Sequence, residues 1–317
     1  MSLSIQDILR NDSKQLEAAL KLDSSSARIE VQCLLQAVLQ VNRAYLLTHP
    51  EQPLDADQHA RYMALLERRL GGEPIAYLLG EREFYGLNFK VSPATLIPRP
   101  ETELLVEQAL QRIPHPDPSL RSPQPSPSLP ARSTPVGSPL LRSDPSAGGR
   151  GSKFRVLDLG TGSGAIALSI AHARPNAEVV AVDESAAALE VAQFNAQRLN
   201  LGNVRLLHSD WFGALQDERF DIIVSNPPYI AADDAHLTQG DVRFEPPSAL
   251  ASGADGLDDI RRICAQAKAR LNVNGWLLFE HGYDQAAQVR ALLQQAGFAG
   301  IFSARDLSGI ERVSGGT

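Results

Sequence analysis

The feature that most constrains this chain is a series of short apolar runs, each separated from the next by a stretch with helical spacing. The clearest runs are RVLDL at 155–159, EVVAV at 178–182 and DIIV at 221–224. Short, nearly continuous apolar strands that alternate with helices are typical of a parallel sheet covered on both faces. The pattern therefore predicts an α/β fold with a doubly wound, mostly parallel sheet.

The same pattern extends over most of the second half of the chain. We expect further strands at 204–207 and 276–279, helices at 165–173 and 185–199, and two final strands within 298–313. The alternation of the two kinds of element places each helix between two strands.

The first 80 residues have a different pattern. Apolar residues recur at three-to-four spacing, as in Ile5, Ile8 and Leu9, which predicts helices. Aromatic and β-branched residues then surround Gly86, which is the composition of a β-hairpin. We therefore predict a small all-α domain at 1–80, a hairpin linker at 81–98 and an α/β domain at 99–317.

A Pro/Ser-rich segment interrupts the predicted α/β domain at 114–152. It contains few apolar residues, so it has little to bury against a core. We predict that this segment is a disordered insert with no part in the chemistry.

A glycine-rich turn follows the first predicted strand, where the next helix begins. Glycine is needed where the backbone takes a positive φ or where a ligand approaches main-chain atoms closely. Asp183 ends the next strand, where a carboxylate can accept hydrogen bonds from both hydroxyls of a ribose. This pair predicts a nucleoside cofactor. The turn consists of Gly160, Thr161, Gly162, Ser163 and Gly164.

The spacing of the glycines favours S-adenosylmethionine over NAD. The turn reads G-x-G-x-G rather than the G-x-G-x-x-G that binds a pyrophosphate at a helix N-terminus. The acidic Asp158 just before it would repel a pyrophosphate but suit the cationic amino acid end of a sulfonium methyl donor.

The sequence Asn226-Pro227-Pro228-Tyr229 follows the strand at 221–224 and so lies at the carboxyl edge of the predicted sheet. Amide and aromatic amine nitrogens are poor nucleophiles because their lone pairs are delocalised. The Asn226 side-chain oxygen and the Pro227 carbonyl can accept both N–H groups of such a nitrogen, and Tyr229 can stack on its planar group. We predict that these residues bind the substrate and that Asn226, Pro227 and Tyr229 are catalytic.

Composition excludes several other classes of protein. The net charge of −7 disfavours general binding to phosphate backbones. No apolar run is long enough to span a membrane, and no secretory signal is visible, so we expect a cytoplasmic location. The two cysteines, Cys33 and Cys264, are far apart and match no disulfide framework or zinc motif, and we expect no metal.

Several segments together resemble the release factor glutamine methyltransferases of bacteria. They include IPRPETE at 97–103, the GTGSG turn at 160–164, SNPPY at 225–229, RFEP at 243–246 and FEHG at 279–282. The resemblance covers nearly the whole chain outside the insert. It implies the fold of a class I S-adenosylmethionine-dependent methyltransferase and methylation of the glutamine in the Gly-Gly-Gln motif of release factors, in translation termination.

The resemblance also implies roles for individual residues. Cofactor contacts are expected from 160–164, Asp183, Trp211 and Asn226, and substrate contacts from 226–229. We expect the helical domain to dock the release factor and the protein to be a monomer. For Arg99, Glu101 and Glu245, a role in lining the site and a purely structural role both stay open.

Three alternative functions fit the sequence less well. An adenine-N6 nucleic-acid methyltransferase would use the same NPPY motif but would need a basic cleft, which the acidic balance disfavours. An NAD-linked oxidoreductase is disfavoured by the glycine spacing. An inactive cofactor-binding protein would be expected to have lost Asn226 or the glycines, and both are present.

Overall fold

The computed structural model describes residues 3–114 and 153–317. Apart from Pro114, the insert predicted to be disordered lies outside the described residues. The described elements are α1 (Ile5–Leu20), α2 (Ser24–Leu39), α3 (Arg43–Thr48), α4 (Ala56–Leu70), α5 (Ile75–Leu79), β1 (Glu81–Phe84), β2 (Leu87–Lys90), η1 (Pro100–Thr102), α6 (Glu103–Leu110), β3 (Arg155–Leu159), α7 (Ala165–Ala173), β4 (Glu178–Asp183), α8 (Ala186–Arg198), β5 (Val204–His208), β6 (Phe220–Ser225), η3 (Ala235–Thr238), η4 (Val242–Phe244), η5 (Pro247–Ala249), α9 (Asp258–Arg270), β7 (Leu271–Glu280), α10 (Ala286–Gln295), β8 (Phe302–Arg305) and β9 (Glu311–Gly316).

A seven-stranded sheet forms the centre of the second half of the chain. Its order is β5-β4-β3-β6-β7-β9-β8, and the first five strands in this order are parallel. β9 lies between β7 and β8 and is antiparallel to both. The predicted doubly wound, mostly parallel sheet is confirmed, and so are the two final strands.

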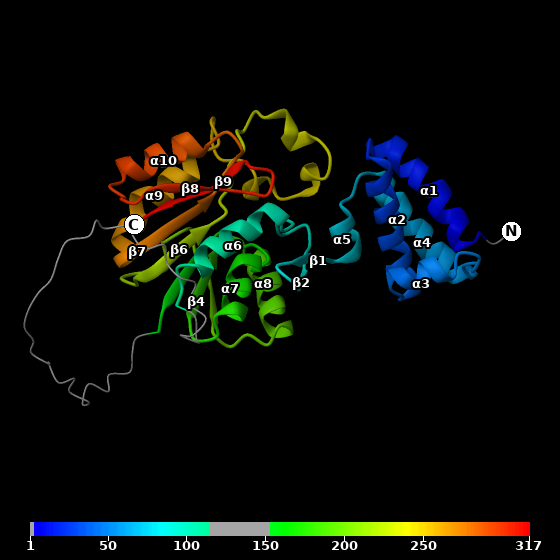
Figure 1. Ribbon diagram of the computed structural model, residues 1–317, viewed down its shortest axis with the longest axis horizontal. Coiled ribbons are helices and arrows are strands. Elements are labelled where there is room, and N and C mark those ends of the chain that lie inside the picture. Colours follow the sequence, from blue (N-terminus) through cyan, green and yellow to red (C-terminus); the bar gives the residue numbers. More distant parts are fainter. Residues whose placement is uncertain (1–2, 115–152) are drawn as a thin grey trace, which may run out of the picture.

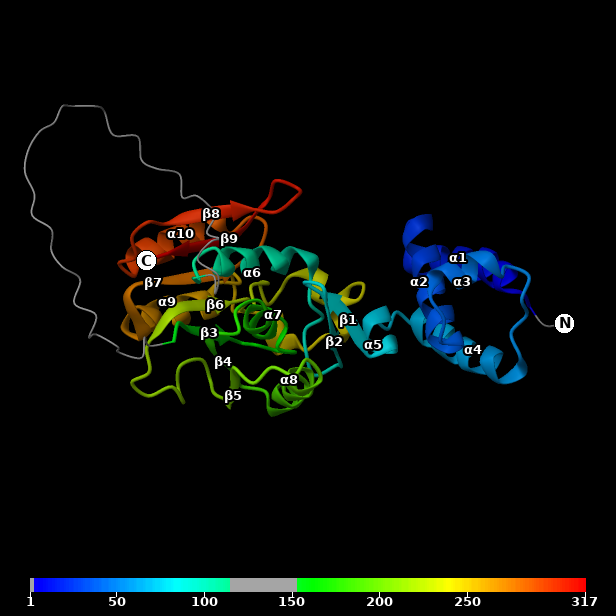
Figure 2. The same ribbon diagram turned by 60° about the horizontal axis from the view of Figure 1, so that its bottom comes forward.

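The apolar strands explain why helices cover both faces of this sheet. Successive side chains of a strand point to opposite faces, so a strand without polar alternation needs a partner on each side. On β3, Val156 packs into a core with α6 and α7, while Leu157 packs into a second core with α9 and α10. Figure 2 shows α6 and α7 on one side of the strands.

The first five helices pack together apart from the sheet. The side chains of Leu16, Leu34 and Leu35 are fully buried in their shared core. Tyr62 is fully buried too, and its hydroxyl donates a hydrogen bond to the Asp12 carboxylate at 2.8 Å, which satisfies the polar end of the ring. In Figures 1 and 2, α5 and the β1–β2 hairpin lie between helices α1–α4 and the sheet.

Arg69, near the end of α4, connects the helices to the other half of the chain. Its guanidinium pairs with Glu30 of α2 at 2.7 Å and with Asp241, just before η4, at 3.0 Å. Only 2% of Arg69 is exposed. A guanidinium this buried needs its partners, because a charge without them is costly away from water. The helical half and the segment that follows NPPY are therefore held together by an ion pair in which the Arg69 guanidinium is buried and the Asp241 carboxylate is partly exposed.

Some element bounds differ from those predicted. The hairpin strands occupy 81–84 and 87–90, a narrower span than the aromatic-rich stretch had indicated. Asp23 caps α2 by accepting hydrogen bonds from two backbone amides. β7 begins at Leu271, well before the apolar run at 276–279, so the sequence NVNG at 272–275 belongs to a strand. The division into domains stays a prediction.

The segments on either side of residues 115–152 lie at the amino edge of the sheet. The Arg174 side chain, just after α7, donates to the carbonyls of Leu110 at 2.9 Å and Ile113 at 3.4 Å. α7 runs opposite to the parallel strands, so its last residue is at the edge where β3 begins. Among the helices of residues 3–114 and 153–317, none is long and apolar enough to cross a membrane.

Candidate active site

The glycine turn lies at the carboxyl end of β3, between the sheet and α7. Gly160, Gly162 and Gly164 all have positive φ, of 70°, 56° and 85°. A Cβ on Gly164 would lie 2.9 Å from Leu168, so this glycine is required for the helix to pack against the turn. A Cβ on Gly162 would meet no atom within 4 Å. Gly162 therefore presents bare backbone to open space, which suits close approach of a ligand.

Asp183 closes the same site from the end of β4. Its two carboxylate oxygens accept hydrogen bonds from the backbone amides of Gly162 and Ser185, at 2.8 Å and 2.9 Å. These bonds hold the carboxylate still and leave lone pairs free for two further donors, such as the hydroxyls of a ribose. Burial raises the pKa of Asp183, and the amide hydrogen bonds oppose this rise.

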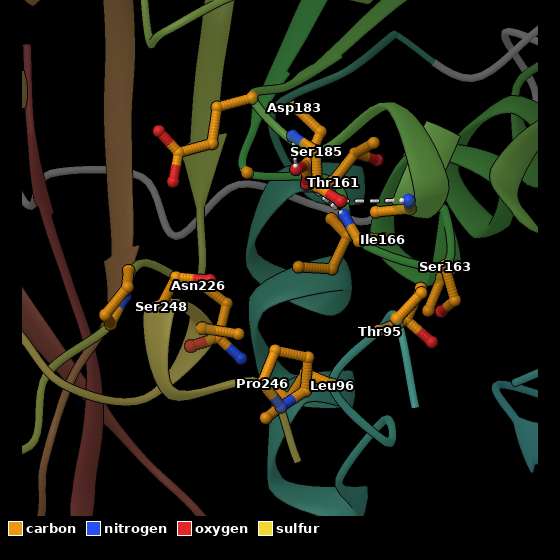
Figure 3. A pocket seen from close by; sticks show the side chains of 18 of the residues that line it. Thr95, Leu96, Thr161, Ser163, Ile166, Asp183, Ser185, Asn226, Pro246 and Ser248 are labelled. Carbon is orange, nitrogen blue, oxygen red and sulfur yellow. Dashed lines mark hydrogen bonds between the residues drawn. The ribbon is translucent and has the colours of Figure 1, made fainter. Parts of the chain in front are cut away.

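A cavity of about 320 Å³ joins these elements to the end of β6. Figure 3 shows Asp183 and Thr161 on one side of it and Asn226 and Pro246 on the other. Its lining residues include Pro93, Ala94, Thr95, Leu96, Pro98, Thr102, Gly160, Thr161, Gly162, Ser163, Ile166, Asp183, Ser185, Trp211, Asn226, Pro228, Pro246 and Ser248.

The cavity thus brings together most of the residues singled out in the sequence. Of the predicted cofactor residues, only Gly164 is not on its wall, because this glycine turns toward α7. Of the predicted substrate residues, Asn226 and Pro228 line the cavity, whereas Pro227 and Tyr229 do not. The Trp211 ring packs over Gly160, at 3.5 Å from the position of a Cβ there.

Within the described residues, only the nitrogen of the Asn226 side-chain amide forms a hydrogen bond. Its Nδ2 donates to the Thr102 hydroxyl at 3.4 Å. Its Oδ1 is buried and finds no hydrogen-bond partner within the described ranges. A buried polar atom without a partner costs free energy, so such atoms are rare unless a ligand supplies the partner. The free oxygen makes Asn226 an acceptor ready for an N–H group.

Tyr229 and Pro227 lie close to Asn226 in the sequence but not on the cavity wall. The Tyr229 hydroxyl donates to Glu280 Oε1 at 3.4 Å, and its backbone carbonyl accepts from Gln285 at 2.9 Å. Burial, with the nearby Glu280 carboxyl, holds the pKa of Tyr229 well above its usual range, so the ring stays neutral. Pro227 is buried, and no backbone hydrogen bond within the described chain ends on its carbonyl.

Asp158 has a different place from the one its charge suggested. It is fully buried and does not line the cavity. Its Oδ2 accepts from the Thr161 hydroxyl at 2.6 Å and from the Ala167 amide at 3.2 Å. Burial raises the pKa of Asp158 to about 7. Asp158 therefore braces the glycine turn against α7 from behind, and its expected contact with a cationic cofactor group is wrong.

The structure places the three residues whose roles the sequence had left open, Arg99, Glu101 and Glu245. Glu245 is buried and accepts from the Ile97 amide at 2.9 Å while pairing with Arg99. Neither Arg99 nor Glu245 lines the cavity, but Pro98 and Pro246 beside them do. The pair therefore fixes two wall segments to one another. Glu101 is exposed and is not a lining residue.

Sequence reasoning missed three parts of the site. The first is the segment 93–98, which was assigned to the hairpin and forms a cavity wall. The second is Thr102, which contacts Asn226. The third is Glu280, at the carboxyl end of β7 beside Tyr229. Position at a strand end was the available signal for Glu280, the same rule that had selected Asp183.

The glycine turn, the acidic end of β4 and the NPPY segment around one cavity, on a sheet whose last strand runs antiparallel, define a class I S-adenosylmethionine-dependent methyltransferase. Two protein-family profiles match the sequence, "Methyltransferase small domain" at 136–244 and "PrmC N-terminal domain" at 7–80. The chain belongs to the release factor glutamine methyltransferase family.

Relatives that match more than nine-tenths of the chain support the family assignment. The release factor glutamine methyltransferase of Xylella fastidiosa (strain 9a5c) is 48% identical over 289 residues, covering 91% of this chain and 92% of that protein. The Bordetella pertussis protein of the same name is 48% identical over 298 residues, covering 94% and 97%. Among solved structures, the hMettl16 catalytic domain is 15% identical, with a TM-score of 0.52 over 80% of this chain and 81% of that chain, and shows the shared fold alone.

Proposed function

We propose that this protein transfers the methyl group of S-adenosylmethionine to the side-chain amide nitrogen (N5) of the glutamine in the Gly-Gly-Gln motif of peptide chain release factors. The observation that carries the proposal is the free Oδ1 of Asn226, a buried acceptor on the cavity wall. The relatives that span the whole chain are named for this reaction.

The proposed cofactor site is the part of the cavity formed by the glycine turn, Asp183 and Trp211. The bare backbone at Gly162 gives room for close contact, and the oriented Asp183 carboxylate offers acceptors for ribose hydroxyls. When bound there, S-adenosylmethionine supplies an electrophilic methyl group on a sulfonium sulfur. The residues present fit this molecule, because the acidic side chains of the lining, Asp183, Glu184, Asp210 and Asp259, outnumber its one guanidinium, that of Arg262. Arg262 is itself paired with Asp210, so the lining suits a cationic methyl donor better than a pyrophosphate.

The proposed substrate site lies across the cavity at Asn226. The Asn226 Oδ1 and the Pro227 carbonyl would accept the two N–H groups of the glutamine amide, which orients the nitrogen lone pair toward the methyl group. A nitrogen–carbon bond forms as the carbon–sulfur bond breaks, and the nitrogen then loses one proton to water. The rate gain comes from orientation, since the amide nitrogen is a weak nucleophile in free solution.

We further propose that helices α1–α5 contact the body of the release factor. A glutamine on a large partner needs a second contact surface to hold it, and these helices are joined through Arg69 to the segment that follows NPPY. The expected monomeric state and cytoplasmic location stay predictions.

The test is methylation of separate candidate acceptors with labelled methyl donor. Purified release factor, duplex DNA and tRNA are incubated with the protein, and products are mapped by mass spectrometry. We expect one methyl group on the glutamine of the Gly-Gly-Gln motif and none on a release factor in which this glutamine is replaced by alanine. Methylation of adenine in nucleic acid, with none on the release factor, would overturn the proposal in favour of an adenine-N6 methyltransferase.

A further inference from the structure

Asn226 and Glu280 occupy equivalent places at the ends of neighbouring strands. Ser225 of β6 pairs with Phe279 of β7, so the next residue on each strand lies at the same edge of the sheet. Asn226 faces the cavity, whereas Glu280 is 2% exposed and lies behind the wall. Like Asn226 Oδ1, the Glu280 Oε2 is buried without a hydrogen-bond partner in the described parts of the chain. Two buried oxygens, Asn226 Oδ1 and Glu280 Oε2, are therefore without a hydrogen-bond partner among the described residues at the same edge of the sheet.

Thr102 lies between these two side chains. It is 3% exposed, lines the cavity and accepts from Asn226 Nδ2 through its hydroxyl oxygen. The Thr102 hydroxyl also lies near the Glu280 carboxyl, whose pKa it lowers, and the contact with Asn226 does not use the hydrogen of this hydroxyl. The Tyr229 hydroxyl donates to Glu280, from the far end of the NPPY segment. The hydroxyls of Thr102 and Tyr229 are therefore both close to Glu280.

A hydroxyl has one hydrogen, and its direction decides what its oxygen can do. When Thr102 donates to Glu280, the oxygen lone pairs of Thr102 face the Asn226 side chain and can only accept. The two ends of an asparagine amide have nearly the same shape, so hydrogen bonds alone decide which end faces a cavity. An acceptor at Thr102 selects Nδ2 for itself and leaves Oδ1 facing the substrate.

We propose that Glu280 is a positioning residue for methyl transfer: by accepting a hydrogen bond from the Thr102 hydroxyl, it leaves Thr102 as an acceptor toward Asn226 and so fixes Asn226 with its oxygen toward the substrate nitrogen. The inference rests on the proposed function, since it requires a substrate with N–H groups to be held. Glu280 acts through Thr102 and Asn226 and does not touch the substrate.

The charge state of Glu280 gives this arrangement a dependence on pH. Burial raises the pKa of Glu280 to about 7, with Glu101 of η1 raising it and Thr102, Arg312 of β9 and Tyr229 lowering it. A protonated Glu280 can donate to Thr102, whose hydrogen then turns toward Asn226 and favours the reversed amide. Activity therefore requires the ionised carboxyl, and kcat should rise with pH through the neutral range.

The first test is the Glu280→Gln variant of the full-length protein, assayed with release factor and methyl donor. At about pH 8, we expect kcat to fall on the order of 100-fold while donor affinity changes little, because Glu280 lies outside the cavity. The rise of kcat through neutral pH should disappear. Glu311→Gln is the matched control: this half-buried glutamate on β9 pairs with Arg290 rather than with Thr102, so it should preserve both the rate and the pH profile.

A stability measurement separates positioning from a structural role. A carboxyl with a raised pKa in the folded state binds its proton more tightly there than in the unfolded chain, so ionisation costs stability as pH rises through neutral. Glu280→Gln should therefore be at least as stable as the original protein at about pH 8, despite its lower kcat. Lower stability that accounts for the loss of activity would overturn the inference.

A second pair of variants tests Thr102 without changing Glu280. Thr102→Val removes the hydroxyl at nearly constant shape and should lower kcat as much as Glu280→Gln does, whereas Thr102→Ser should restore it. Combining Glu280→Gln with Thr102→Val should add little further loss, because both act through one hydrogen bond. Full kcat in Glu280→Gln, or additive losses in the double variant, would overturn this inference alone. Failure of the original protein to methylate release factor would instead overturn the proposed function.

Discussion

Replacing Gly162 by alanine tests the cofactor site, and replacing Gly86 by alanine measures the cost of backbone strain alone. Gly162 has φ 56° and Gly86, in the β1–β2 turn, has φ 74°. An added Cβ meets nothing within 4 Å at either position. The two substitutions therefore impose the same kind of strain in the folded chain, and they differ only in what occupies the open space when ligand is bound.

The expected magnitudes follow from this difference. A side chain in the left-handed region costs about 1 to 2 kcal/mol, so both variants should lose that amount of stability and a few degrees in Tm. If the donor lies against the Gly162 backbone, the new methyl group overpacks the contact, which costs about a further 1 to 3 kcal/mol of binding. This corresponds to roughly a five- to 150-fold weaker Kd for Gly162→Ala, whereas Gly86→Ala should bind the donor as the original protein does.

Two measurements decide the outcome. Thermal unfolding without ligand gives the cost of strain for each variant, and calorimetric titration with S-adenosylmethionine gives the donor Kd. Equal donor affinity in Gly162→Ala and Gly86→Ala would refute the placement of the cofactor against this turn. A much larger loss of stability in Gly162→Ala than in Gly86→Ala would show that the space beside Gly162 is not open.

Three further predictions concern other residues. Asn226→Ala should lower kcat on the order of 100-fold with most donor affinity kept, because it removes the acceptor for the substrate amide; full turnover in a radiolabel assay would contradict the mechanism. Asp183→Asn should weaken donor binding about tenfold or more in calorimetry, since it replaces an acceptor with a donor beside the Gly162 amide. Arg69→Met should lower the free energy of unfolding by about 3 kcal/mol, because it leaves Glu30 and Asp241 unpaired. Arg68→Met, beside it on the surface, should change the free energy of unfolding by less than about 1 kcal/mol, and chemical denaturation measures both.

The sheet was predictable because its strands carry their own signal. β3 occupies 155–159 as expected, because a short apolar run bounded by a charged residue and a glycine is typical of a buried strand. β7 was harder, because its first half is polar and Val273 is 92% exposed. In that half only Leu271 pairs with β6, and the register shifts before Trp276, so no local pattern in the sequence marks it as a strand.

The candidate site was predictable where one rule applied, that ligands bind at the carboxyl ends of parallel strands. This rule correctly brought Asp183 and Asn226 to one cavity. Charge alone misplaced Asp158, because sequence does not reveal that its side chain turns away from the cavity and under α7. Thr102 could not be found locally, since its importance comes from a contact with a residue more than 100 positions away.

The segments that flank residues 115–152 lie at the edge of the sheet opposite the candidate site. Leu110 and Ile113 accept hydrogen bonds from Arg174 at the amino edge of the sheet, and β3 begins at that same edge, so both flanking segments are anchored away from the cavity. In general, the closure entropy of a loop changes by only about 0.6 kcal/mol for each doubling of its length. Chain can thus be added or removed here at almost constant stability, which makes this edge the natural position for inserting a fluorescent reporter.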